Sequence, residues 1–196
     1  MKYSVVAVLL GIAQTSRAAD WARKADIDGM TIEVRSVAGS AFEEIRIRAN
    51  SVHTTQRLCE AVWGDGDMKV AEPGFKLRRV LRQQKDERWT YEQIATPIVS
   101  DRDYTMYARR MTEPELGVCQ VFFETRNQDG PPPQPGFVRI PRIAGSWTLE
   151  PNDGRGSLIT YVIFSEPGGA IPAWLSRGAQ RENAVSWMKR ILARAE

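Results

Sequence analysis

Six consecutive segments of the chain show the alternation of apolar and polar residues, or the enrichment in β-branched and aromatic residues, that is typical of β-strands. Short turn-forming stretches separate them, such as Lys85-Asp86-Glu87. Consecutive strands joined by short turns form an antiparallel meander, so this run constrains the fold more than any other feature. The six segments are residues 75–83, 89–96, 102–111, 118–126, 137–150 and 158–165.

Two further strands are expected before this run, at residues 30–37 and 42–52, with a turn at Gly39 between them. Residues 20–24 predict a short helix whose first residue, an Asp, is a favourable cap. The N-terminal part of the chain therefore predicts a short helix followed by a hairpin.

Two helices are expected at the ends of the strand region. Thr54 or Thr55 caps the first, which runs to Trp63. Pro172 stands where the first turn of the second helix tolerates proline. This C-terminal helix is amphipathic and has no partner helix of comparable length, so its apolar side must lie on the sheet. The apolar side comprises Trp174, Leu175, Ala184, Val185, Met188, Ile191 and Leu192.

These elements predict an α+β, helix-grip architecture. A curved antiparallel sheet of about eight or nine strands wraps around the long C-terminal helix. Such a sheet and helix enclose more space than side chains readily fill, so an internal cavity is expected, with its mouth between loops and helix.

Residues 1–18 have the pattern of a secretory signal peptide: a basic Lys2, the apolar run 5–13, and small residues around a cleavage site after Ala18. The apolar run is roughly half the 20 residues of a membrane span. An uncleaved anchor or a buried helix is the alternative. We expect a periplasmic or secreted protein with a single domain over residues 19–196.

Cleavage would also change the charge of the chain, which has 27 Lys and Arg against 24 Asp and Glu, a net charge of +3. Loss of Lys2 and Arg17 leaves 25 of these 27 basic residues against 24 acidic ones, a net charge of +1. Most of the support for nucleic-acid binding, which favours a strongly basic surface, is then lost.

The single His and two Cys exclude most metal sites, because a structural zinc needs about four such ligands and a catalytic zinc about three. His53 is expected to be a cap or surface residue. Cys59 and Cys119 could pair in an oxidising compartment, but two cysteines make no disulfide framework, so free, buried thiols are predicted. We expect no metal, no cofactor and no catalytic residues.

Three stretches resemble conserved segments of the START (StAR-related lipid transfer) domain, a family of the helix-grip superfamily. Residues 100–104, Ser-Asp-Arg-Asp-Tyr, resemble its S-x-R-D-[FY] segment. Val138-Arg139, followed by Gly-Ser-Trp at 145–147 and a Pro at 151, resembles its V-R … G-x-W … P strand. Residues 166–175, EPGGAIPAWL, resemble its D-P-x-G-x-[IL]-P-x-W-[IL] entry to the C-terminal helix. With the order of elements, the resemblance covers about residues 20–195.

The resemblance implies that the protein binds, and transfers, one lipid or other apolar ligand in the cavity. The gate would be the C-terminal helix and the loop at residues 112–117. The partners expected are this ligand and, transiently, a membrane, with no nucleic acid, and the chain is expected to be a monomer. One alternative is a helix-grip enzyme of the cyclase or hydrolase type. Another is a nucleic-acid or protein-interaction module with an exterior patch.

Strand alternation predicts which residues face the cavity. The more apolar set should point inward, which selects the odd-numbered residues of 75–83, 89–96 and 118–126 and the odd-numbered residues near the end of 137–150. For 102–111, the resemblance implies that Arg102 points into the cavity, and this agrees with the otherwise apolar even-numbered set. The predicted ligand-binding residues are Arg102, Tyr104, Met106, Trp89, Tyr91, Phe123, Trp147, Trp174 and Met188.

Arg102 has two interpretations, because a buried guanidinium must be paired or hydrated. It binds a polar or anionic ligand head group, or it pairs with Asp101, Asp103 or a buried Glu. Several family members have a second Arg six positions later, paired with an acid on the preceding strand. Here Ala108 stands at that position and Trp89 near the position of the acid, which predicts an apolar patch and a more apolar ligand.

Overall fold

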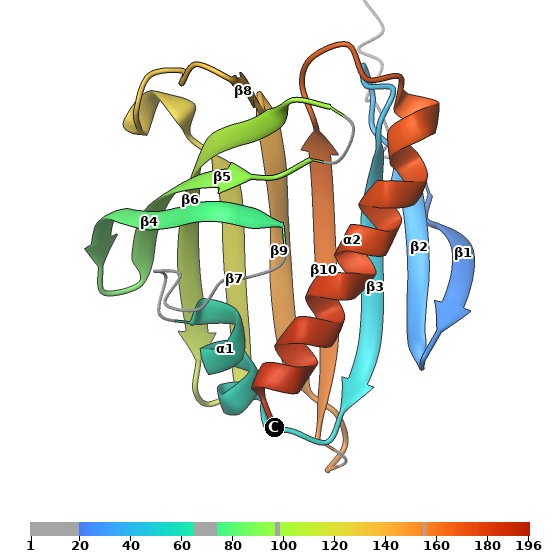
Figure 1. Ribbon diagram of the computed structural model, residues 1–196. Helices are drawn as coiled ribbons and strands as arrows, with labels where there is room; N and C mark the ends of the chain where they lie inside the picture. The colour runs from blue at the N-terminus through green and yellow to red at the C-terminus, as the bar shows by residue number, and fades with distance from the viewer. Residues whose placement is uncertain (1–19, 65–73, 97–98, 155) are drawn as a thin grey trace, which may run out of the picture.

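The computed structural model describes residues 20–64, 74–96, 99–154 and 156–196. The predicted signal peptide, residues 1–18, lies outside the described residues. One curved sheet forms the body of the molecule, and helix α2 (Ala173–Arg194) crosses it in front of β3 and β10 (Figure 1). Of the helices that the structure describes, none combines the length and hydrophobicity needed to cross a membrane.

The described residues form a sheet of ten strands, and nine of these follow the spatial order β1-β2-β3-β10-β9-β7-β6-β5-β4. The pairing of β3 with β10 joins the N-terminal strands to the last one. All pairs are antiparallel except that of β8, which pairs with the start of β6 in parallel. The strands are β1 (Ala22–Ile27), β2 (Met30–Ser36), β3 (Glu43–Ser51), β4 (Phe75–Gln84), β5 (Glu87–Ile94), β6 (Asp101–Glu113), β7 (Val118–Thr125), β8 (Phe137–Arg139), β9 (Arg142–Pro151) and β10 (Ser157–Glu166).

The α+β helix-grip architecture is confirmed, and two details of the secondary structure differ from expectation. The prediction of a short helix at residues 20–24 is wrong, because strand β1 begins at Ala22. Asp28 and Gly29 both have positive φ, at 50° and 77°, and connect β1 to β2. An Asp-Gly pair favours this kind of two-residue hairpin turn. The predicted strand 137–150 is interrupted between β8 and β9 at Ile140 and Pro141, and proline has no N–H to donate to a ladder.

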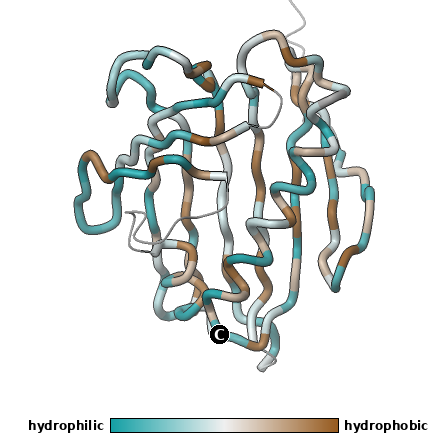
Figure 2. The backbone as a smooth tube through the Cα atoms, in the orientation of Figure 1, coloured by the Kyte–Doolittle hydropathy of each residue, from teal (hydrophilic) through white to brown (hydrophobic). Residues whose placement is uncertain are grey.

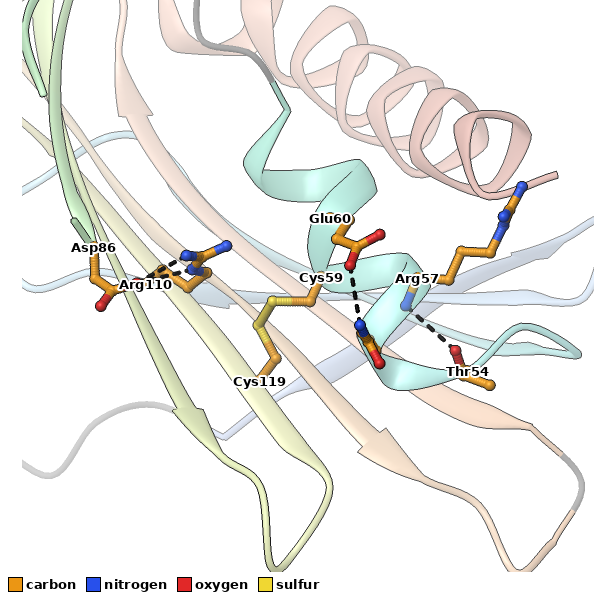
Figure 3. The surroundings of a disulfide bond; sticks show 8 residues. Thr54, Arg57, Cys59, Glu60, Asp86, Arg110 and Cys119 are labelled. Carbon is orange, nitrogen blue, oxygen red and sulfur yellow. Dashed lines mark hydrogen bonds and ion pairs between the residues drawn. A yellow bond between two sulfur atoms is a disulfide. The ribbon is translucent and has the colours of Figure 1, made fainter. Parts of the chain in front are cut away.

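The two predicted helices form close to their expected bounds. Helix α1 (Thr55–Trp63) begins after Thr54, whose hydroxyl accepts a hydrogen bond from the backbone N–H of Arg57 (Figure 3). Hydrophobic and hydrophilic residues alternate along the strands and along α2 (Figure 2). The main core lies where α2 and α1 meet the sheet, and its α2 residues include Ala184, Met188 and Ile191.

A disulfide joins Cys59 of α1 to Cys119 of β7 (Figure 3), with 6.0 Å between the two Cα atoms. The prediction of free thiols is therefore wrong. Both cysteines are buried, because α1 packs directly against β7. Sixty residues separate them in the sequence, so only the packing of the helix on the sheet brings them together.

Candidate ligand cavity

A cavity of about 690 Å³ lies between the inner face of the sheet and the two helices. Its wall is largely apolar and takes side chains from seven strands as well as from α1 and α2. Examples of the apolar wall residues are Ile45, Val121, Phe123, Trp147, Ile163 and Trp187. Gly145 leaves space for this wall, since a Cβ there would lie 2.5 Å from Cζ of Phe123. The glycine of the G-x-W segment thus allows the Phe123 ring to pack on β9.

One wall of the cavity contains a row of charged and polar residues. Arg78 of β4, Glu92 of β5 and Tyr104 of β6 are direct cross-strand neighbours. The Glu92 carboxylate accepts hydrogen bonds from Arg78 Nε at 3.0 Å and from the hydroxyls of Thr90 at 2.9 Å and Tyr104 at 2.5 Å. Burial, together with the charge of Glu92, raises the pKa of Tyr104 well above its usual value. The buried acid therefore has three donors, as a carboxylate in an apolar region requires.

A second arginine, Arg88 of β5, connects the sheet to the end of α1. Its guanidinium donates to the backbone carbonyls of Trp63 and Gly64 and lies 4.4 Å from the centre of the Trp63 ring. These carbonyls stand at the helix C-terminus, where a cation is favourable. Arg88 therefore fixes the end of α1 in the cavity wall.

The wall formed by β9 and β10 contains two stacked aromatic rings. Trp147 and Tyr161 are cross-strand neighbours, with 3.9 Å between their ring centres and 11° between their planes. Burial raises the pKa of Tyr161, so its hydroxyl is protonated at neutral pH. Within the part of the chain that the structure describes, this hydroxyl has no hydrogen-bond partner.

Aromatic and guanidinium groups connect the edge strand β4 to α2. The rings of Phe75 and Trp187 meet edge to face at 5.8 Å. Arg78 lies over Phe75 at 4.4 Å, and Arg190 lies over Trp187 at 4.5 Å. These contacts hold α2 against the edge of the sheet on this side of the cavity.

Four of the nine predicted ligand-binding residues line the cavity, namely Tyr104, Met106, Phe123 and Trp147. Two residues of α2 do not belong to its lining. Met188 is fully buried in the core, and Trp174 at the start of α2 is 73% exposed. An apolar stripe on a helix marks the side that packs, but it does not separate core residues from cavity residues.

The predicted inward orientation of Trp89 and Tyr91 is wrong, because these side chains lie on the opposite face of the sheet. Trp89 Nε1 donates to Asp129 at 3.1 Å, and the Tyr91 hydroxyl donates to Asp103 at 2.9 Å. The inner set of β5 is the polar one and includes Arg88, Thr90 and Glu92. The more apolar set therefore does not mark the inner face here.

Strand β4 also departs from the expected alternation. Arg78 lines the cavity, whereas Leu77 and Leu81, which were predicted to face inward, do not. The register of β4 on β5 shifts between Phe75 and Leu77 and again between Val80 and Arg82. Each irregularity changes which residues face inward. Sequence reasoning missed Arg78 and Glu92, and opposite charges on two adjacent strands were the only signal available.

Arg102 is buried but does not line the cavity. Its guanidinium donates to the backbone carbonyl of Ser100, and Nε lies 3.4 Å from that of Pro167. Burial lowers the pKa of Arg102. Arg102 pairs with no carboxylate among the described residues and connects the start of β6 to the segment that leads into α2. Its predicted contact with a ligand head group has no support in this geometry.

Asp103 is fully buried on the outer face of the sheet. Arg139 of β8 donates to both of its carboxylate oxygens at 2.8 Å. Burial disfavours the charged form, but the hydrogen bonds from Arg139 and Tyr91 outweigh it and lower the pKa of Asp103. The acid of the S-x-R-D-[FY] segment and the arginine of the V-R segment thus form one ion pair outside the cavity.

One further expectation from the family pattern is wrong, and the gate expected at residues 112–117 stays a prediction. Ala108 lies opposite Arg88, whereas Trp89 lies opposite Tyr107, so Ala108 and Trp89 do not form an apolar patch. The predicted gate loop, residues 112–117, supplies none of the described residues that line the cavity. Its Gly117 lies beside Pro151 and Thr55, near the start of α1.

Comparison with known proteins assigns this architecture to a family. The START domain family model matches residues 19–196. An uncharacterized protein of Pseudomonas aeruginosa is 29% identical over 98% of this chain and 95% of its own length. The phosphatidylcholine transfer protein of Mus musculus is 23% identical over 87% of this chain and 81% of its own. The solved structure of a STAR-related lipid transfer protein fragment from Xanthomonas axonopodis has a TM-score of 0.78, 26% identity, and covers 89% of this chain and 98% of its own.

Proposed function

The chain belongs to the START domain family, and on that premise we propose that it binds one lipid or other apolar molecule in its cavity and carries it without chemical change. The observation that carries the proposal is the cavity itself. Its volume of about 690 Å³ falls within the range of about 300–1,000 Å³ that is usual for sites that enclose small molecules. Its wall is mainly apolar, with a few polar groups at fixed positions, as such sites require.

The relatives support a lipid as the ligand class. Two of the proteins to which this chain is similar are named for the transfer of phosphatidylcholine or of lipid. We carry over the general class, an apolar ligand held inside the domain, and not the particular lipid.

The state of the polar groups favours binding over catalysis. A general acid or base needs a pKa near the working pH and access to the substrate. Burial raises the pKa of Tyr104 and of Tyr161 away from neutrality. Glu92 already accepts three hydrogen bonds from protein groups. The proposal therefore assigns these groups to the structure of the wall and to ligand contact.

The proposal includes export, with residues 1–18 as a cleaved signal peptide. The disulfide between Cys59 and Cys119 supports this, because disulfides persist in oxidising compartments. We also propose that the protein acts as a monomer, since one chain encloses the cavity. Transient contact with a membrane during ligand exchange is a further part of the proposal, and the exposed Trp174 at the start of α2 supports it. N-terminal sequencing of the protein from its own cells should give a chain that starts at Ala19, and a chain that starts at Met1 would refute the cleavage.

Native mass spectrometry of the protein purified from its own cells tests the function. The expected result is a complex of one chain with one apolar molecule, identified by extraction into organic solvent. A bare chain that also binds no fatty alcohol, fatty acid, alkane or phospholipid offered to it would contradict the proposal.

A further inference from the structure

The charged groups of the cavity wall are already engaged with other protein groups. Glu92 accepts its three hydrogen bonds, and Arg88 donates to two backbone carbonyls. Glu43 at the cavity edge pairs with Arg181 at 2.8 Å. Arg78 and Arg194 also have partners. A charged ligand head would have to displace one of these interactions or remain unpaired in an apolar region, which is costly.

The Tyr161 hydroxyl is different, because it is a polar group in the wall with no partner among the described residues. The side chain is only 3% exposed and lines the cavity. The ring is held in place by its stack on Trp147. A neutral hydroxyl can both donate and accept one hydrogen bond.

We propose that the ligand is an uncharged apolar molecule with a single hydroxyl or carbonyl group, which hydrogen-bonds to the Tyr161 hydroxyl, and that diacyl phospholipids are excluded. This inference rests on the proposed function and specifies the ligand class for the same cavity. The engaged charges of the wall exclude an ionic head group, that of a phospholipid included, and Tyr161 supplies the contact for one neutral polar group.

A matched series of probes with the same alkyl chain tests each part: hexadecane, hexadecanol, hexadecanoate, and vesicles of dioleoyl phosphatidylcholine. Affinity is followed by the fluorescence of the wall residues Trp147 and Trp187, and stoichiometry by native mass spectrometry. Hexadecanol should bind at least tenfold more tightly than hexadecanoate, and no one-to-one phospholipid complex should form. Hexadecanoate also tests whether Arg190 binds a carboxylate. The Nη1 atom of Arg190 is buried without a partner among the described residues, and its charge acts on Tyr161.

Tyr161→Phe keeps the stacked ring and removes only the hydroxyl. It should weaken hexadecanol about five- to tenfold, the effect of one hydrogen bond, and leave hexadecane unchanged. Tyr107→Phe is the matched control, because the Tyr107 hydroxyl donates to Glu87 on the outer face. Tyr161→Phe with unchanged hexadecanol affinity would overturn the contact.

The outcomes separate this inference from the proposed function. Hexadecanoate bound as tightly as hexadecanol, or a one-to-one phospholipid complex, would overturn the inference and leave the proposed function in place. Failure of every probe to bind, hexadecane included, would contradict both.

Discussion

Asp103 and Arg139 form a two-pronged ion pair, with two N–O distances of 2.8 Å, that ties strand β6 to strand β8 on the face of the sheet away from the cavity. The Tyr91 hydroxyl completes the set of donors to the acid. These residues belong to two separate motifs of the family, and their pairing gives both motifs a structural role.

Asp103→Asn should lower the free energy of unfolding by about 3–5 kcal/mol, because it leaves the buried Arg139 guanidinium without its counter-charge. Chemical denaturation at pH 7 measures the loss. Asp26→Asn, in the exposed pair with Arg23, is the control and should change stability little. Equal effects of the two variants would contradict the structural role of Asp103.

The same pair predicts how stability depends on pH. The pKa of Asp103 is lower in the folded state than the value of about 3.9 expected when unfolded. Its contribution is therefore complete above the unfolded pKa and is lost as the pH falls through the folded pKa. The stability difference between wild type and Asp103→Asn should narrow as the pH is lowered from 5 to about 2. A difference that stays constant over this range would refute the assignment.

The disulfide should contribute substantially to stability. It closes a loop of 60 residues, for which the loss of chain entropy in the unfolded state corresponds to about 4 kcal/mol. A reducing agent should lower the Tm of the wild type, and Cys59→Ala with Cys119→Ala should have a similarly lowered Tm. That double variant is the control for the reagent and should not respond to it. A wild-type Tm unaffected by full reduction would contradict the prediction.

Removing Glu92 alone should lower the free energy of unfolding more than removing both members of the Arg78–Glu92 ion pair. Glu92→Leu leaves the Arg78 charge in the wall with one partner fewer and should cost about 3–5 kcal/mol. Adding Arg78→Met removes that charge and should recover part of the loss. Urea denaturation of the two single variants and the double variant gives the coupling energy. If the loss of unfolding free energy in the double variant equals the sum of the losses in the two single variants, the two residues act independently and the prediction is contradicted.

Local patterns predicted the order of most elements and three of the inner strand faces, those of β6, β7 and β9. Phe123 and Trp147 line the cavity as alternation indicates, because their strands bury apolar residues on the inner side. The rule fails in β5, where Glu92 faces inward and Trp89 faces outward. Where a cavity wall contains a buried ion pair, polar residues face inward, which is the reverse of the usual pattern. The sequence of one strand does not show which charged residue on the adjacent strand will pair with it.

Other features depend on distances that the sequence does not contain. The approach of Cys59 to Cys119 follows from the packing of α1 on β7. The inward position of Arg78 follows from two register shifts in β4, which the residue pattern does not indicate.

Filling the cavity with a bulky side chain and measuring ligand occupancy tests whether the apolar ligand is bound inside it. Ala108 of β6 lines the cavity, and Val162 of β10 lies outside the lining. Ala108→Trp and Val162→Trp are to be purified alike, checked for fold by circular dichroism, and analysed by native mass spectrometry. Val162→Trp should retain one bound apolar molecule, as does the wild type, whereas folded Ala108→Trp should be bare. Equal occupancy of the two folded variants would contradict binding inside the cavity.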